Sequence, residues 1–363
     1  MQTAVSQPFI PRPADQRIPA LDNFLKSAIL LGLFGLTLAL TQSLLNWLGV
    51  SGKGIPPLSQ AIPAAALILV SAVVTALLIS AQGAIAHEGI HKVLSRNRFV
   101  NDLAGGFLSA LVVFLPFYAN RKWHLDHHGE THAHGIDPEE AIHRHNFWIA
   151  FLFGGPIAIW EHYKIVFSFL TDRGPKRRIR VAEGLKDLSF VAAAAAFYFV
   201  LLPALGVNVW LTIVPMFTIG PLIYSFRAIC DHYAVPDLAK STEYLKEKCP
   251  GLVRDSRFRV VDSWVILTNP FLNWLWSHLN YQQVHHRYPF LSHVYLPEIY
   301  EVTKEYQPYL VARGYLDCLR TIRSRPYYTR PEEMAAHFQL PLHAEPMGLK
   351  LNMAGEMETR ASR

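Results

Sequence analysis

Residues 63–91 read PAAALILVSAVVTALLISAQGAIAHEGIH, and this stretch decides the fold. Pro63 to Ala86 carries no charged residue and is long enough for a helix to cross a hydrocarbon layer of roughly 30 Å. His87 and His91 follow directly, so on a helix that continues from the span both side chains project from one face. Histidine is the commonest metal ligand near neutral pH. The stretch therefore predicts a membrane helix that ends in two metal-binding imidazoles.

Three more predicted spans accompany this one. Ile29–Leu48 is uncharged and would form an antiparallel pair with the first, and Leu188–Phe226 is uncharged and long enough for two crossings. Hydrophobic residues make up 51% of the chain and charged residues only 17%, below the usual quarter. The composition is typical of a polytopic membrane protein, and we predict an all-α fold with four transmembrane helices.

The predicted membrane domain occupies residues 25–300. Residues 1–24 form a polar N-terminal tail that lacks the features of a signal peptide. The chain beyond Val235 is mostly polar and aromatic, and we expect it to cap one face of the membrane, with residues 301–363 as its C-terminal segment. Three cysteines without paired spacing predict neither disulfides nor a thiolate metal site.

Two further histidine clusters lie in polar segments beside apolar stretches. They are His124-Leu125-Asp126-His127-His128 and Gln282-Gln283-Val284-His285-His286. Adjacent residues of a helix point in different directions, so the second cluster suits two neighbouring metals better than one. A shared site requires all three clusters on the same side of the membrane.

That requirement determines how two shorter apolar segments are interpreted. A single crossing by Leu103–Asn120 would put His91 and His124 on opposite faces, so we predict a re-entrant or interfacial hairpin there. Asn146–Trp160 is short and contains two glycines and Pro156, which predicts a broken interfacial segment.

The distribution of basic residues predicts which side the clusters face. Lysines and arginines surround the first two clusters and precede Leu188, whereas the opposite connectors hold only Lys53. By the positive-inside rule, both termini and all three clusters face the cytoplasm. The net charge of +6 is then a consequence of topology, and we expect no nucleic-acid partner.

The first cluster also matches a different class of enzyme. His87-Glu88-x-x-His91 has the H-E-x-x-H pattern of zinc metalloproteases, with Glu88 as general base. A membrane zinc metalloprotease is therefore the alternative from another class. It would leave the histidines of the other two clusters without a role, whereas imidazoles in such number also suit copper, nickel and iron.

The three clusters together resemble the histidine boxes of the membrane fatty acid desaturase and hydroxylase superfamily, over residues 25 to 300. The resemblance implies a di-iron centre that activates O₂, with no catalytic residue beyond the metal ligands. The segment Arg227–His232 resembles an additional ligand-bearing element after the fourth span, where Asp231 could orient the imidazole of His232. The implied ligands are His87, His91, His124, His127, His128, His232, His285 and His286.

The third cluster departs from the pattern at its first position. Gln282 stands where many members of the superfamily have histidine, and His278 or Asn280 could compensate for the missing imidazole. Glutamine occurs there in front-end desaturases, which act between an existing double bond and the carboxyl end. We see no fused haem-binding donor domain of the kind typical of that subgroup, so the regiochemistry stays open.

The resemblance also implies the substrates and partners. We expect desaturation of the acyl chain of a fatty acid or lipid in the bilayer, with O₂ as co-substrate and electrons from a separate ferredoxin or cytochrome b5-like donor with its reductase. The same site in the superfamily also hydroxylates or ketolates lipids and carotenoids, or decarboxylates fatty acids to terminal alkenes.

Several residues near the histidine clusters receive further predictions. Arg121, Lys122 and Arg287 could meet an anionic head group, although their role in positive-inside topology is the favoured interpretation for each of them. His132 and His134 would form a loop beside the metal site, with Glu130, Asp137 and Glu139 as possible partners of the ligands. The histidines expected at the surface or interface are His143, His145, His162, His293, His337 and His343.

Overall fold

The fold was analysed in a computed structural model. It describes residues 10–11, 13–50, 57–131, 136–233, 263–304, 309–324, 349–351 and 357–359. The chain divides into two compact units, which we describe separately. The membrane unit comprises Pro19–Leu125 and Trp148–Arg227, and the polar unit comprises Met1–Ile18, Asp126–Phe147 and Ala228–Arg363. His132 and His134 lie outside the described residues.

Among the described residues, four helices are long and apolar enough to cross a membrane, which confirms the predicted number. They are α1 (Ala20–Trp47), α2 (Leu58–Ile90), the run Arg177–Ala204 and the run Trp210–His232. The third run consists of α7 (Arg177–Ala196), a π-helical turn (Phe197–Leu201) and α8 (Leu202–Ala204), and the fourth of α9 (Trp210–Phe217) and α10 (Ile219–His232).

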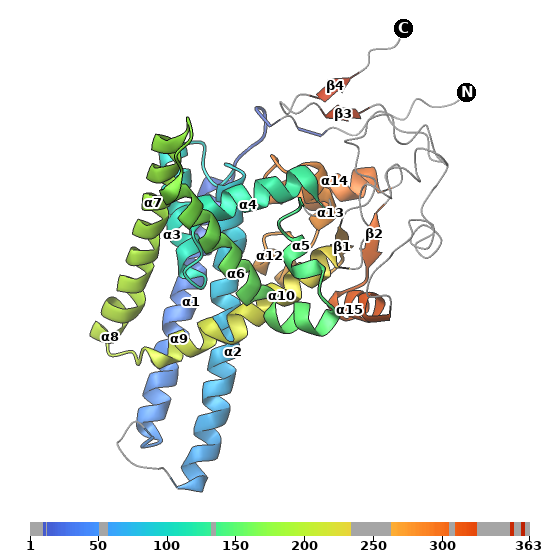
Figure 1. Ribbon diagram of the computed structural model, residues 1–363. Helices are drawn as coiled ribbons and strands as arrows, with labels where there is room; N and C mark the ends of the chain where they lie inside the picture. Colours follow the sequence, from blue (N-terminus) through green and yellow to red (C-terminus); the bar gives the residue numbers. More distant parts are fainter. Residues whose placement is uncertain are drawn as a thin grey trace. The chain divides into compact units, whose positions relative to one another are not determined.

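Helices α1 and α2 lie side by side in the membrane unit (Figure 1) and are joined by polar contacts as well as apolar ones. Ser27 Oγ donates to Gln82 Oε1 at 2.8 Å, and Gln82 Nε2 donates back to the Ser27 carbonyl at 3.0 Å. Within hydrocarbon, a polar side chain must find such a partner inside the protein. The pair therefore holds α2 in place, and α2 carries His87 close to its end.

The predicted hairpin at Leu103–Asn120 is confirmed as two helices with a sharp reversal between them. Helix α3 (Arg98–Leu111) and helix α4 (Phe117–Glu130) are separated by a turn in which Val113 and Phe114 have φ of 48° and 57°. Such left-handed backbone is unusual for bulky residues and occurs where the chain must turn abruptly. The Ser109 hydroxyl closes the turn by donating to the Leu115 carbonyl at 3.0 Å.

The prediction of a short, broken segment at Asn146–Trp160 is wrong, because helix α6 runs unbroken from Phe147 to Thr171 with Pro156 inside it. The glycines there serve packing. A β-carbon on Gly155 would overlap the backbone of Pro221 in α10, and the Gly155 amide donates to Ser225 Oγ at 2.7 Å. Glycine permits this close approach of two backbones while the helix continues.

The polar unit contains short elements instead of long helices. Two small sheets occur in it beside the helices that the all-α prediction expected. Strands β1 (Trp264–Ile266) and β2 (Leu310–Ala312) pair in parallel, and β3 (Leu349–Leu351) and β4 (Met357–Thr359) pair antiparallel. The remaining elements are α5 (Glu140–His143), α12 (Pro270–Leu275), α13 (Gln282–Arg287), a 3₁₀ turn (His293–Tyr295), α14 (Leu296–Thr303) and α15 (Tyr315–Ser324).

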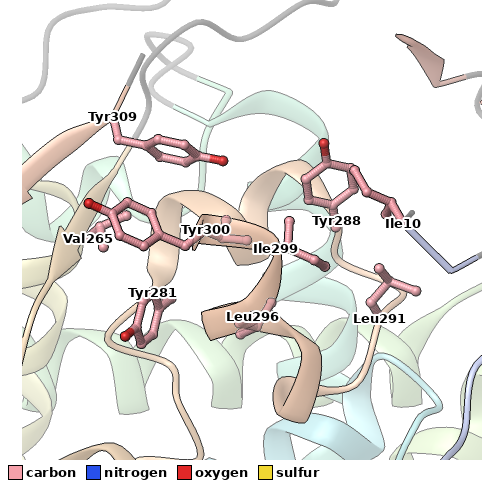
Figure 2. Close-up of a cluster of buried hydrophobic side chains, with 10 residues drawn as sticks. Ile10, Val265, Tyr281, Tyr288, Leu291, Leu296, Ile299, Tyr300 and Tyr309 are labelled. Atoms are coloured by element: carbon pink, nitrogen blue, oxygen red, sulfur yellow. The ribbon is translucent and has the colours of Figure 1, made fainter. Parts of the chain in front are cut away.

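A buried aromatic cluster fixes α13, the helix of the third histidine cluster. Tyr281, Tyr300 and Tyr309 pack in a row with ring centroids 5.7 and 5.2 Å apart, beside Leu296 and Ile299 of α14 (Figure 2). Val284 of α13 is fully buried in the same cluster. The helix is thus anchored through Val284, while His285 and His286, which follow it directly in sequence, point in other directions.

Candidate metal centre

In the membrane unit, three imidazoles converge through their Nε2 atoms. His124 Nε2 lies 2.8 Å from His87 Nε2 and 3.0 Å from His91 Nε2. A single ring nitrogen offers one proton or one lone pair, so His124 cannot satisfy both neighbours by hydrogen bonding. A cation among the three nitrogens would accept all three lone pairs. The contact between His91 and His124 also places the first two clusters together, as the hairpin prediction required.

Helix α4, which carries the second histidine cluster, is positioned by a carboxylate from α7, a helix distant in sequence. Asp187 of α7 is fully buried, and it accepts hydrogen bonds from the backbone amides of Tyr118 at 2.7 Å and Ala119 at 2.9 Å. The first amides of a helix have no partner within it, and an acidic group there also interacts favourably with the helix dipole. Asp187 therefore fixes the start of the helix that carries His124.

The end of α2 is held by a second polar network. Arg121 Nη2 donates to the Gly89 carbonyl at 2.8 Å and pairs with Asp102 at 2.6 Å. Burial raises the pKa of the Asp102 carboxyl, but the hydrogen bond and charge of Arg121 outweigh this effect and lower it overall. Arg121 is thus engaged within the protein by the Gly89 carbonyl and by Asp102.

Close backbone packing brings the same region together. Gly89 lies beside Gly105 of α3, and a β-carbon on Gly105 would come within 2.7 Å of the Phe117 ring. The glycine of the first histidine box is therefore needed for space. The Arg121 guanidinium covers the Phe117 ring at 4.5 Å, which adds a cation–π contact.

In the polar unit, a second group of imidazoles converges. The ligand nitrogens of His127, His232 and His286 all lie within 4.8 Å of one another, and all three residues are buried. His127 Nε2 lies 3.3 Å from His232 Nε2. Asp137 Oδ1 lies 2.9 Å from His127 Nδ1, which places the ring proton on that nitrogen and leaves Nε2 free to bind a metal.

The remaining two predicted ligands form a pair of their own. His128 Nε2 lies 3.1 Å from His285 Nε2. Neighbouring histidines therefore diverge in both clusters: His127 and His286 join the group of His232, whereas His128 and His285 meet each other. This divergence confirms the expectation that adjacent imidazoles on one helix point in different directions.

Gln282 lies in the group where histidine was expected. Its Nε2 is 3.3 Å from His232 Nε2 and 3.2 Å from His286 Nε2. The proposed substitutes lie elsewhere. Asn280 Nδ2 donates to the Ile266 carbonyl at 2.7 Å, and His278 meets His293 with 3.2 Å between their Nδ1 atoms. Neither contact brings a donor atom to the imidazoles of the group.

Two acidic residues that follow the second histidine cluster, Asp137 and Glu139, lie near the group of His127, His232 and His286. Glu139 Oε2 lies 3.2 Å from His143 Nε2, 3.7 Å from His127 Nε2 and 3.9 Å from His232 Nε2. Asp231, predicted to orient His232, is buried, and Glu130 is exposed at the end of α4.

The prediction of a surface position is wrong for three other histidines. His143, His162 and His293 are all buried. Glu139 is the N-cap of α5, four residues before His143, and this spacing is the signal that could have revealed the contact between Glu139 and His143 from the sequence.

Comparison with known proteins agrees with this geometry. The sequence pattern of the family named fatty acid desaturase matches residues 63–315. This chain belongs to the fatty acid desaturase family. It is also 24% identical, over 275 residues and 63% of its length, to the Delta(5) fatty acid desaturase fat-4 of Caenorhabditis elegans. The match spans 56% of that relative, so the chain covers about half of its length.

The family assignment gives the two histidine groups a chemical setting. A fatty acid desaturase is an oxidoreductase, and four apolar helices agree with a membrane-bound member. Desaturases of this kind use two irons, and converging neutral imidazoles are suitable ligands for iron. The residues therefore fit the metal, and the family favours this class over the zinc protease that the H-E-x-x-H pattern alone would allow.

Proposed function

We propose that this protein is an O₂-dependent di-iron desaturase that introduces a double bond into the acyl chain of a fatty acid or lipid. The observation that carries the proposal is the presence of two separate groups of converging imidazoles, one within each unit. His127, His232 and His286 would hold one iron. In the membrane unit, His87, His91 and His124 would hold the second iron, and His128 and His285, which meet within the polar unit, stay candidate ligands.

The protein's contribution is to fix the ligands and to keep water away. His127 is fully buried, its Nδ1 is held by Asp137, and α4 is held at its start by Asp187. Ligands fixed in this way lose little freedom when a metal binds. Bound iron would supply the redox chemistry and O₂ binding that removal of hydrogen from an unactivated carbon requires.

The surroundings support a lipid substrate and an external electron source. The four apolar helices place the enzyme in a bilayer, where an acyl chain is available. We propose that both termini and the histidines face the cytoplasm, where a separate ferredoxin or cytochrome b5-like donor with its reductase delivers electrons. The name of the nematode relative suggests a fatty acyl substrate and leaves its length and head group open.

The test is expression in a host of defined lipid composition together with a matched electron donor. We expect about two irons per chain, O₂ consumption that depends on reductant, and a new double bond detected by mass spectrometry of the lipids. His286→Ala should abolish the product, whereas His145→Ala, which removes an imidazole outside both groups, should not. An alcohol or a terminal alkene as the product would overturn desaturation. One zinc per chain with peptide hydrolysis under argon would overturn the whole proposal.

A further inference from the structure

We propose that Glu139 is itself a metal ligand, and that its carboxylate completes the polar-unit group at which Gln282 interrupts the imidazoles. The inference rests on the proposed function, since it assigns one more donor to the same site. It concerns residues of the polar unit alone: His127, His232, His286 and Glu139.

The distances agree with a shared metal. Ligand atoms bound to one ion at about 2.0–2.2 Å each can lie no more than about 4.4 Å apart. Glu139 Oε2 meets this condition toward His127 Nε2 at 3.7 Å and His232 Nε2 at 3.9 Å, and those two nitrogens are 3.3 Å apart. These three atoms can therefore bind the same ion without a change of backbone. Glu139 lies outside the group in which the ligand nitrogens of His127, His232 and His286 are all within 4.8 Å of one another, so its side chain must rotate to share an ion with His286 as well.

The carboxylate is held in this position from both sides. The Glu139 amide donates to Asp137 Oδ1 at 2.9 Å, and the same oxygen accepts from His127 Nδ1 at 2.9 Å. Asp137 thereby fixes the backbone of Glu139 relative to the ring of His127. On the other side, His143 Nε2 lies 3.2 Å from Glu139 Oε2, one helical turn along α5.

Charge favours the same assignment. Glu139 and Asp137 are only 6% and 4% exposed, and a buried carboxylate is costly unless a positive charge or hydrogen bonds compensate it. A divalent cation would compensate both carboxylates, and two histidines with one carboxylate form a ligand set typical of non-haem iron(II).

The competing interpretation is that Glu139 only accepts a hydrogen bond from His143. The two interpretations differ in which variants should affect metal binding. If the contact is merely structural, Glu139→Gln, whose amide can still hydrogen-bond to His143, should have no greater effect than His143→Gln. If Glu139 binds the metal, Glu139→Gln should weaken metal binding far more than His143→Gln does.

The experiment titrates the purified full-length, metal-free protein with Co²⁺ and records the visible absorption of the bound ion. Glu139→Gln, Glu139→Ala and His143→Gln are compared with Glu140→Gln, which makes the same charge change one residue away. We expect two Co²⁺ per wild-type chain, and second-ion affinity at least about tenfold weaker in both Glu139 variants, with an altered spectrum. Glu140→Gln should match wild type, and adding Gln282→His to Glu139→Gln should restore the second ion.

The outcomes separate this proposal from the one before it. Two tightly bound ions with an unchanged spectrum in Glu139→Gln and Glu139→Ala would overturn the assignment of Glu139 alone, as would equal losses in Glu139→Gln and His143→Gln. A wild-type protein that takes up fewer than two ions would overturn the di-iron function and this inference with it. Far-ultraviolet circular dichroism and gel filtration identify any variant that has lost its fold, and the nearly isosteric Glu139→Gln then decides.

Discussion

The two histidine groups are held in place by different means. In the membrane unit, His87, His91 and His124 are fixed through the backbone: Asp187 caps α4, and Arg121 holds the carbonyl of Gly89. In the polar unit, a side-chain carboxylate touches the imidazole ring itself, as Asp137 does with His127. Helix positions therefore determine the first group, whereas the second depends on individual side-chain contacts, and the two should respond differently to mutation.

The largest expected effect comes from removing one imidazole from either group. His124→Ala and His232→Ala should each lower the iron content from about two to about one per chain and reduce turnover at least about a hundredfold, since each removes a direct ligand. Metal analysis and turnover measurements with a reductant would check this. Loss of both irons from either variant would show that the two groups bind iron together. That result would contradict the expectation that the two groups respond differently to mutation.

The next effect concerns close packing in the membrane unit. Gly105→Ala places a β-carbon about 2.7 Å from the Phe117 ring, so it should lower the free energy of unfolding by about 1–3 kcal/mol. Gly32→Ala in α1 is a matched control, because a β-carbon there meets no atom within 4 Å. Thermal unfolding in detergent measures both. Equal melting temperatures for the two variants would contradict the claim that α2, α3 and α4 require this contact.

A smaller loss is expected when the cap of α4 is weakened. Asp187→Asn keeps one acceptor oxygen but loses the charge, and it should cost about 1–2 kcal/mol of stability. Iron should be lost from the membrane-unit group before the polar-unit group, as Mössbauer spectra of the partly loaded protein would reveal. Asp172→Asn, at a partly exposed ion pair near Arg180, is the control. A preferential loss from the polar-unit group would contradict the assigned role.

The smallest effect is a dependence on pH. The pKa of Asp102 is lowered in the folded protein, so its pairing with Arg121 contributes stability above the ordinary value of 3.8, and this is lost as the pH falls through the folded pKa. The pair is partly exposed, and its contribution should be at most about 1 kcal/mol. Denaturant unfolding between pH 6 and about 3 would measure it. Asp102→Asn should flatten this part of the profile, and an unchanged slope would exclude the pair as its source.

Much of this architecture follows from local sequence. Uncharged runs of sufficient length predicted the four spans, and the requirement that His91 and His124 share a face predicted the hairpin. Both depend on residues close in the chain or on a single topological condition. The i, i+4 spacing of His87 and His91 is equally local.

The contacts that the sequence did not predict join residues far apart. Asp187 caps α4 from 69 positions away in sequence, and Gly155 touches α10, which turns a suspected helix break into a packing contact. The burial of His143 depends on how α5 folds beside His232. No local pattern encodes such pairings, because a carboxylate or a glycine has many possible partners until the helices have packed.

The crowding around Phe117 limits the order in which substitutions can be accepted at the positions that surround its ring. Its ring lies against the space in which a side chain at either Gly89 or Gly105 would have to fit. A larger residue at Gly105 therefore becomes tolerable only after the ring has been replaced by something smaller, whereas one at Gly89 must also clear the Gly105 backbone, 3.1 Å from its β-carbon. That first step would also remove the surface on which the Arg121 guanidinium rests. Positions 89, 105 and 117 thus form an epistatic set, in which substitutions that are harmful singly can be acceptable together.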